Sequence, residues 1–201
     1  MKFSQMPYER PDLEGMKQTL SGLVERLKGA ASYEEAKAVF LEKEQELKHI
    51  DTQATLASVR HSIDTRDQFY DGEETFWNSA FPQLQEYMQA WTAAMLASSF
   101  RKDFEAEYGD LLFVNAEIQL KTFSPEIIPQ LQQENDLTTE YEKLLASAQI
   151  PFEGKTYTLS QLTPFKTDAD DARRLAAWKA EGQWYKDHQG DLDRIYDQLT
   201  H

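Results

Sequence analysis

"SYEEAKAVFLEKEQELKHI", residues 32–50, has the pattern of a long amphipathic helix and contains neither glycine nor proline. Ser32 and Glu35 have the spacing of a capping box, in which a hydroxyl and a carboxylate each bond a free backbone N–H at a helix start. Apolar residues then recur at helical spacing, at Ala36, Phe40, Leu47, Ile50, Ala54 and Ala57. The pattern therefore predicts a helix that begins at Ser32 and ends near residues 70–72.

Two neighbouring stretches have the same character. Pro11 and Asp12 suit the start of a helix and Gly29 suits its end, so a first helix is expected between them. Residues 73–100 carry a broad apolar face, which predicts a third helical segment. Pro82 lies inside this segment and is expected to kink the helix or divide it in two, because proline has no backbone N–H.

Shorter helices are expected in the second half of the chain. They cover 101–109, closed by Gly109; 110–123, where 111–114 could pass for a strand; a stretch capped by Ser124 and Pro125 that ends before Pro151; and a last region from about 171, capped by Asp168 or Asp170. One interval breaks the helical rhythm. "IPFEGKTYT", residues 150–158, places Glu153 and Gly154 between short apolar and β-branched flanks, which predicts a small β-hairpin.

The composition agrees with a helical protein. Of 201 residues, 40% are hydrophobic, and the chain contains only 8 Gly and 7 Pro. That hydrophobic content is enough for a folded core, and the scarcity of helix breakers favours helices. The predicted fold class is all-α, an elongated multi-helix domain over residues 1–201 with one small hairpin near 150–158.

Charge and cysteine content exclude several classes of protein. The net charge is −14, which repels phosphate backbones and anionic lipids, so no nucleic-acid or membrane partner is expected. The chain has no cysteine, which excludes disulfides, thiolate zinc sites and cysteine nucleophiles. The first twelve residues contain no apolar signal-peptide region, and a cytoplasmic location is expected.

Metal-binding motifs are sparse. The four histidines are His49, His61, His188 and His201, and none begins the HExxH motif that holds zinc in many metallopeptidases. Glu46 with His49 forms one ExxH unit, whereas helical di-iron proteins use two such units with further glutamates. A solvated helix face accounts for a single unit. No catalytic and no metal-ligating residue is therefore predicted in this chain.

"SVRHSIDTRDQFYDGEETFW", residues 58–77, is the stretch richest in polar and aromatic side chains. Arg60 and Asp64 are four residues apart, so an ordinary ion pair on a helix accounts for much of it. The acidic run at 168–171 lacks the alternation and glycine of a calcium loop and suits a helix start. The aromatic residues at helical spacing are expected to be core: Phe76, Trp77, Trp91, Trp178, Trp184 and Tyr185.

Several long stretches, taken together, resemble the amino-terminal region of bacterial oligoendopeptidases of the thimet and oligopeptidase F class, close to Pz-peptidase-like enzymes. They are "PYERPD", "SVRHSIDTRDQFYDGEETFW", "AEIQLKTFSPEI", "LQQENDLTTEYEKLLASAQIPFEGKTYTLSQLTPF" and "RRLAAWKAEGQWYKDH". They occur in this order from Pro7 to about Leu199. The helical phase continues to Leu199 without a cap, so we expect the chain to be cut from a longer protein.

The resemblance implies a zinc metalloendopeptidase of short peptides, whose HExxH histidines and later glutamate lie in a carboxy-terminal part. This chain would be the helical wall of the substrate channel, with no zinc and no activity of its own, and its partner would be the missing catalytic part. Arg60, His61 and Asp64 are the residues predicted to line the channel. Two alternatives stay open: a stand-alone helical interaction module, and a helical metal-carboxylate protein that would bind iron or manganese.

Overall fold

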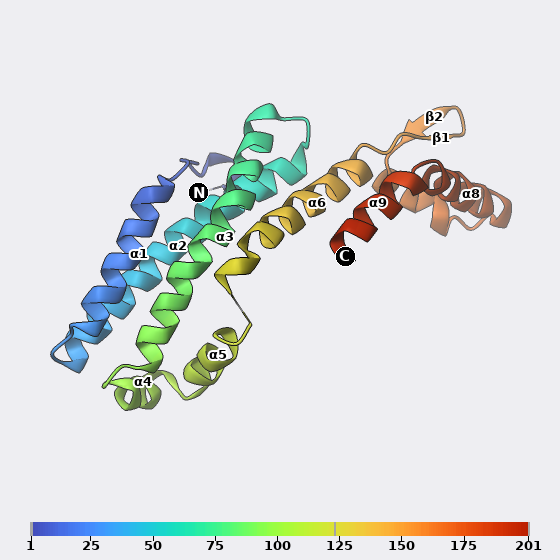
Figure 1. The fold of residues 1–201 in the computed structure, drawn as a ribbon. Coiled ribbons are helices and arrows are strands. Elements are labelled where there is room, and N and C mark those ends of the chain that lie inside the picture. The colour runs from blue at the N-terminus through green and yellow to red at the C-terminus, as the bar shows by residue number, and fades with distance from the viewer. Residues whose placement is uncertain (1, 123, 201) are drawn as a thin grey trace. The chain divides into compact units, whose positions relative to one another are not determined.

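The computed structural model describes residues 2–122 and 124–200, and most of them are helical (Figure 1). The elements in chain order are η1 Phe3–Gln5, α1 Leu13–Lys28, α2 Tyr33–Ile63, α3 Gln68–Leu96, α4 Arg101–Tyr108, α5 Leu111–Gln119, η2 Pro125–Ile127, α6 Ile128–Ala146, β1 Ile150–Phe152, β2 Lys155–Tyr157, α7 Leu159–Leu162, η3 Thr163–Thr167, α8 Asp171–Asp187 and α9 Gln189–Thr200. The predicted all-α class with one small hairpin is confirmed.

The contacts between elements group the chain into two compact units, Met1–Gln132 and Gln133–His201. We call them the large unit and the small unit. The prediction of a single domain over 1–201 concerns whether the two units fold and act together, and it stays a prediction. No helix of the described residues is long and apolar enough to cross a membrane.

In the large unit, α1, α2 and α3 run alongside one another and contact each other (Figure 1). Their apolar faces, with one phenylalanine each from α4 and α5, form two clusters of buried residues. One contains Leu23, Val24, Leu27, Ala36, Val39, Phe40, Trp91, Ala94, Met95, Phe104 and Phe113. The other contains Met16, Leu20, Ile50, Ala54, Ala57, Trp77, Ala80 and Leu84. The residues with helical spacing in the sequence are therefore the residues that hold the three helices together.

The caps of the first two helices follow the sequence closely. The Asp12 side chain accepts a hydrogen bond from the Glu14 N–H, and Gly29 ends α1. At the start of α2, the Ser32 hydroxyl accepts from the Glu35 N–H at 3.3 Å. The Glu35 carboxylate accepts from the Ala31 N–H at 2.8 Å. Half of the predicted capping box is thus present, because Ser32 caps the Glu35 N–H while the Glu35 carboxylate bonds the N–H of Ala31 and not that of Ser32.

The predicted end of the second helix was wrong. α2 ends at Ile63, and α3 begins at Gln68, five residues before the predicted start at residue 73. Asp67 ends the short connection, because its carboxylate accepts hydrogen bonds from the N–H groups of Phe69 and Tyr70 and so caps α3. The start of α3 is therefore set by the N-cap Asp67. The prediction missed it because the connection contains no glycine or proline to mark the end of a helix.

α3 runs without interruption through Pro82 to Leu96, so the alternative of a divided helix was wrong. Proline cannot donate the bond that its position in the helix requires. Close to Pro82, but at a different carbonyl from the one that the proline N–H would have bonded, the side-chain amides of Gln83 and Gln132 each donate to the Ser79 carbonyl at 2.9 Å. Gln132 thereby ties the start of α6 to α3.

The small unit contains the hairpin. Strand β1 pairs antiparallel with β2, with Phe152 opposite Lys155. Glu153 and Gly154 between them both have positive φ, 49° and 76°, as a two-residue type I′ turn requires. The buried core of the small unit contains Ala148, Ile150, Phe152, Leu162, Ala177 and Trp184. The prediction of a hairpin at 150–158 is confirmed.

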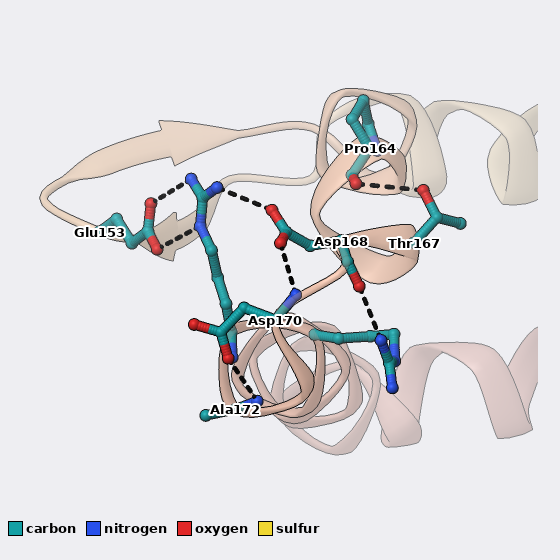
Figure 2. A network of polar contacts seen from close by, with 8 residues as sticks. Glu153, Pro164, Thr167, Asp168, Asp170 and Ala172 are labelled. Atoms are coloured by element: carbon teal, nitrogen blue, oxygen red, sulfur yellow. Dashed lines mark hydrogen bonds and ion pairs between the residues drawn. The ribbon is translucent and has the colours of Figure 1, made fainter.

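A polar network joins this hairpin to the start of α8 (Figure 2). The Arg173 guanidinium donates two bonds of 2.7 Å to the Glu153 carboxylate and one of 2.8 Å to Asp168. It also lies 4.9 Å from the centre of the Phe165 ring. Asp170 caps α8 by accepting from the N–H groups of Ala172 and Arg173. Of the two predicted caps, Asp170 is therefore the one used.

Candidate functional site

Arg60, the first of the predicted channel residues, lies on α2 and holds the amino-terminal segment against that helix. Its guanidinium donates to the Met6 carbonyl at 2.7 Å, to the Phe3 carbonyl at 3.2 Å and to the Tyr70 hydroxyl at 2.7 Å. It also lies over the Phe3 and Tyr70 rings. The predicted ion pair with Asp64 was wrong, because Arg60 uses its donors across the fold.

The other two predicted residues differ in burial. His61 is 1% exposed, and its Nε2 lies 3.5 Å from Oδ1 of Asp71. Neither of its ring nitrogens makes a hydrogen bond with a described residue. Asp64 is exposed and accepts from the Arg66 Nε at 3.0 Å, which lowers the pKa of the Asp64 carboxyl below its ordinary value. Arg60, His61 and Asp64 therefore lie close together along the chain, in three different environments.

A second cluster, which the sequence did not reveal, closes the same end of the large unit. Glu73 is 4% exposed and accepts two hydrogen bonds from Arg10, at 2.9 and 2.7 Å, and a short one from the Tyr8 hydroxyl. The Arg10 guanidinium lowers the pKa of Glu73, and burial raises the pKa of Tyr8. Gln53 accepts from the Glu9 N–H at 3.0 Å. "PYERPD" is thus clamped onto α2 and α3.

A groove lies along α2 and α3 of the large unit. Two adjoining hollows of about 710 and 280 Å³ share five lining residues: Lys43, Glu44, Trp91, Thr92 and Gln119. The larger is also lined by Leu47, Gln85, Met88, Gln89, Thr122, Ile127 and Leu131. The smaller continues to Phe40, Met95, Leu112, Phe113, Asn115 and Ala116. We call the two together the α2–α3 groove.

The α2–α3 groove combines an apolar floor with a few polar groups, as ligand sites usually do. Trp91 is buried and Lys43 has its ammonium 5.6 Å from the Trp91 ring centre. The Gln89 amide donates to the Gln119 carbonyl at 3.4 Å, which links α3 to the end of α5. Sequence reasoning placed Trp91 in the core but identified no groove, because the lining residues come from separate helices.

Another hollow, of about 570 Å³, lies in the small unit and is lined in part by Gln149, Trp184 and His188. The His188 ring stacks on Trp184 with ring centres 4.3 Å apart. Its Nδ1 lies 2.8 Å from the Trp184 carbonyl, an acceptor, so Nδ1 donates. Stacking and hydrogen bonding with Trp184, one helical turn earlier, therefore explain the position of the His188 ring.

The described residues do not form a metal site. Across 2–122 and 124–200, no three side chains of histidine, aspartate or glutamate are grouped so that they could hold an ion. Glu46 and His49 lie on α2, where His49 is exposed. Asp170 and Asp168, in the acidic run, are used by a helix cap and by Arg173. The residues present therefore do not fit the zinc of a metallopeptidase.

Comparison with known proteins gives the family. The peptidase M3 N-terminal domain family matches residues 3–123, more than half of the chain. This chain belongs to that family. No match was found among curated proteins.

Solved structures extend the likeness of this M3 N-terminal domain to the whole chain. A Pz peptidase A with an inhibitor is 39% identical, with a TM-score of 0.95, over 98% of this chain and 35% of its own. An oligoendopeptidase F is 38% identical, with a TM-score of 0.97, over 100% of this chain and 36% of its own. An oligoendopeptidase F from Bacillus anthracis strain Ames is 39% identical, with a TM-score of 0.95, over 99% and 37%. The M3 chain thus spans little more than a third of these peptidases.

Proposed function

We propose that this chain is the amino-terminal helical part of a zinc metalloendopeptidase that hydrolyses short peptides in the cytoplasm, and that it shapes the substrate channel. The observation that carries the proposal is the match of 98–100% of the chain to 35–37% of three solved peptidase chains. The catalytic part would be the remainder of such a chain. Since the described residues do not fit a zinc site, the zinc would be held by that remainder and this part would be inactive alone.

The α2–α3 groove supports a role in holding peptides. Its volume of about 710 Å³ in the larger hollow is typical of small-ligand sites. The amides of Gln85, Gln89 and Gln119 offer both donors and acceptors, as a peptide backbone does. That Arg60, His61 and Asp64 also line the channel stays a prediction; Asp64, exposed, is the one with a free approach for a ligand.

An exposed apolar stripe favours this proposal over a stand-alone module. Leu111, Val114 and Ile118 are 64%, 46% and 55% exposed and recur along one face of α5. Phe113 on the other face is 1% exposed. A protein that acts alone seldom leaves such a face in water. In the proposal this α5 stripe is covered by the remainder of the peptidase.

The proposal is tested by adding to this chain the part of a related peptidase that the chain does not cover. The chain is mixed with the zinc-containing remainder of the 38%-identical oligoendopeptidase F, and hydrolysis is measured on a short quenched peptide and on a folded protein that carries the same sequence in a loop. We expect no hydrolysis by the chain alone, and cleavage of the short peptide but not of the folded protein by the mixture. Val114→Asp should weaken this reconstitution and exposed Tyr196→Ser should not. A remainder with the same activity and size limit without the chain would contradict the proposal.

A further inference from the structure

Lys43 carries a charge in a largely enclosed position. Its side chain is 11% exposed, and its ammonium pairs with the Glu44 carboxylate at 3.0 Å while lying 5.6 Å from the Trp91 ring centre. An ammonium has three N–H donors. Among the described residues one donor has an oxygen partner, and it belongs to the next residue on the same helix. Lys43 thus brings unused donors into the α2–α3 groove.

A shielded cation with unused donors favours an anionic oxygen. Hydrogen bonds between an ammonium and a carboxylate are about twice as strong as neutral ones, and an enclosed site screens them less than water does. The chain as a whole has a net charge of −14. Its overall field therefore repels an anion, and any preference for a carboxylate must come from a local contact such as the one at Lys43.

The groove on either side of Lys43 suits the end of a peptide. The hollow of about 710 Å³ has the amides of Gln85 and Gln89, which can bond a backbone. The hollow of about 280 Å³ continues past Phe40, Met95 and Phe113, which suit an apolar side chain. Lys43 lies where the two hollows meet.

We propose that Lys43 binds the carboxy-terminal carboxylate of a short peptide in the α2–α3 groove, with the last side chain in the smaller, apolar hollow. Glu44 is the competing internal partner: its side chain is 38% exposed, and it can turn toward water when the peptide carboxylate takes its place. The inference rests on the proposed function, since it names how the peptide-handling part recognises its ligand.

The test measures binding to the chain itself by calorimetry, with an N-acetylated five-residue peptide ending in leucine, as the free acid and as the C-terminal amide. We expect the free acid to bind about tenfold more tightly than the amide, because the amide removes one charge-assisted contact. Lys43→Gln should abolish this difference and Lys43→Arg should retain most of it. Lys48→Gln, the same charge change at an exposed position of α2, should leave both affinities unchanged.

A variant of Glu44 gives the most specific test of the inference. If it competes with the peptide for Lys43, Glu44→Gln should strengthen binding of the free acid about two- to fivefold and leave the amide unchanged. A purely structural Lys43–Glu44 pair predicts no gain. Weaker binding after Glu44→Gln, equal binding of acid and amide, or no binding of either would overturn the inference. Reconstituted hydrolysis with a size limit would then leave the proposed function standing.

Discussion

The two units of this chain are stabilised in different ways. The large unit has two buried apolar clusters along three long helices and closes one end with a buried carboxylate, Glu73. The small unit has one cluster of six buried residues and adds polar braces between its short elements. Arg173 joins the hairpin to α8, and Lys166 pairs with Glu181 where both side chains are nearly enclosed. Both units therefore join their elements through charged side chains, and they differ in the size of the buried apolar core.

The comparison shows how burial scales with size. Long helices place many apolar side chains against one another, so the interior of the large unit is mainly apolar. Its buried polar residues, among those described, are Gln53, His61 and Glu73. The small unit has two strands of three residues and a four-residue helix, which bury little surface. Hydrogen bonds to charged groups then set the positions of its elements.

Phe104→Ala should have the largest effect. Phe104 is 0% exposed, and its ring centre lies 5.0 Å from that of Tyr33 and 5.5 Å from that of Phe40. Emptying this position should lower the free energy of unfolding by about 3–5 kcal/mol. Urea unfolding with hydrogen exchange on each unit measures it. If small-unit amides keep their protection, the units unfold separately; equal loss in both would support a single domain.

Glu73→Gln tests an ion pair whose carboxylate is buried, for comparison with a pair in which both side chains are exposed. The change leaves the Arg10 guanidinium and the Tyr8 hydroxyl without their carboxylate, at a cost of about 1–3 kcal/mol in unfolding free energy. Arg26 also makes a two-bond contact with Glu42, with both bonds 2.7 Å long, but there both side chains are about half exposed. Arg26→Gln should therefore cost less. Equal costs in urea unfolding would contradict the importance of burial.

The same carboxylate makes stability depend on pH. The Arg10 guanidinium holds the pKa of Glu73 below its ordinary value of 4.5. A lowered folded-state pKa gives a stabilisation that is present above the unfolded value and is lost as pH falls through the folded one. The difference in unfolding free energy between the natural chain and Glu73→Gln should therefore shrink as pH falls below 4.5. A difference that stays constant down to pH 3 would contradict the assignment.

Asp67→Ala and Asp170→Ala should have the smallest effects and form a matched pair, one in each unit. Each aspartate accepts two backbone bonds at a helix start, at 2.9 and 3.3 Å for Asp67 and at 2.9 and 3.4 Å for Asp170. Each loss should cost about 1 kcal/mol. Because the small unit has the smaller core, the same cost should lower amide protection over more of it. Hydrogen exchange on both variants measures the spread.

Local signals in the sequence predicted much of the fold. Asp12 and Gly29 delimit α1, and Glu153 with Gly154 forms the turn of the hairpin. These features depend on residues a few positions apart, so a pattern reveals them. The end of α2 could not be predicted from such a pattern, since residues 58–71 contain no glycine or proline. Asp64 accepts a bond from the Arg66 side chain, and Asp67 accepts one from the Phe69 N–H, just after α2 ends. An aspartate inside a helix has the same letter in the sequence, so these bonds cannot be read from the residue type alone.

The candidate site was harder to predict. Lys43 is an ordinary lysine of a charged helix until α3 brings Trp91 beside it and the groove forms around both. The side chain of Glu73 was equally hard to place, because its partners Tyr8 and Arg10 precede it by 65 and 63 residues. Contacts of this kind follow from helix packing, which one sequence without relatives does not specify.

The clamp on "PYERPD" also sets an order of events during synthesis. Tyr8 and Arg10 leave the ribosome 63–65 residues ahead of the carboxylate that they bind. At about 5–20 residues per second, this corresponds to a wait of about 3–13 s. The waiting segment has an arginine, a glutamate and two prolines among its six residues, so it stays hydrated and resists pairing as a strand. The contacts of Tyr8 and Arg10 with Glu73 therefore form only after the 63–65 residues that follow them have been synthesised.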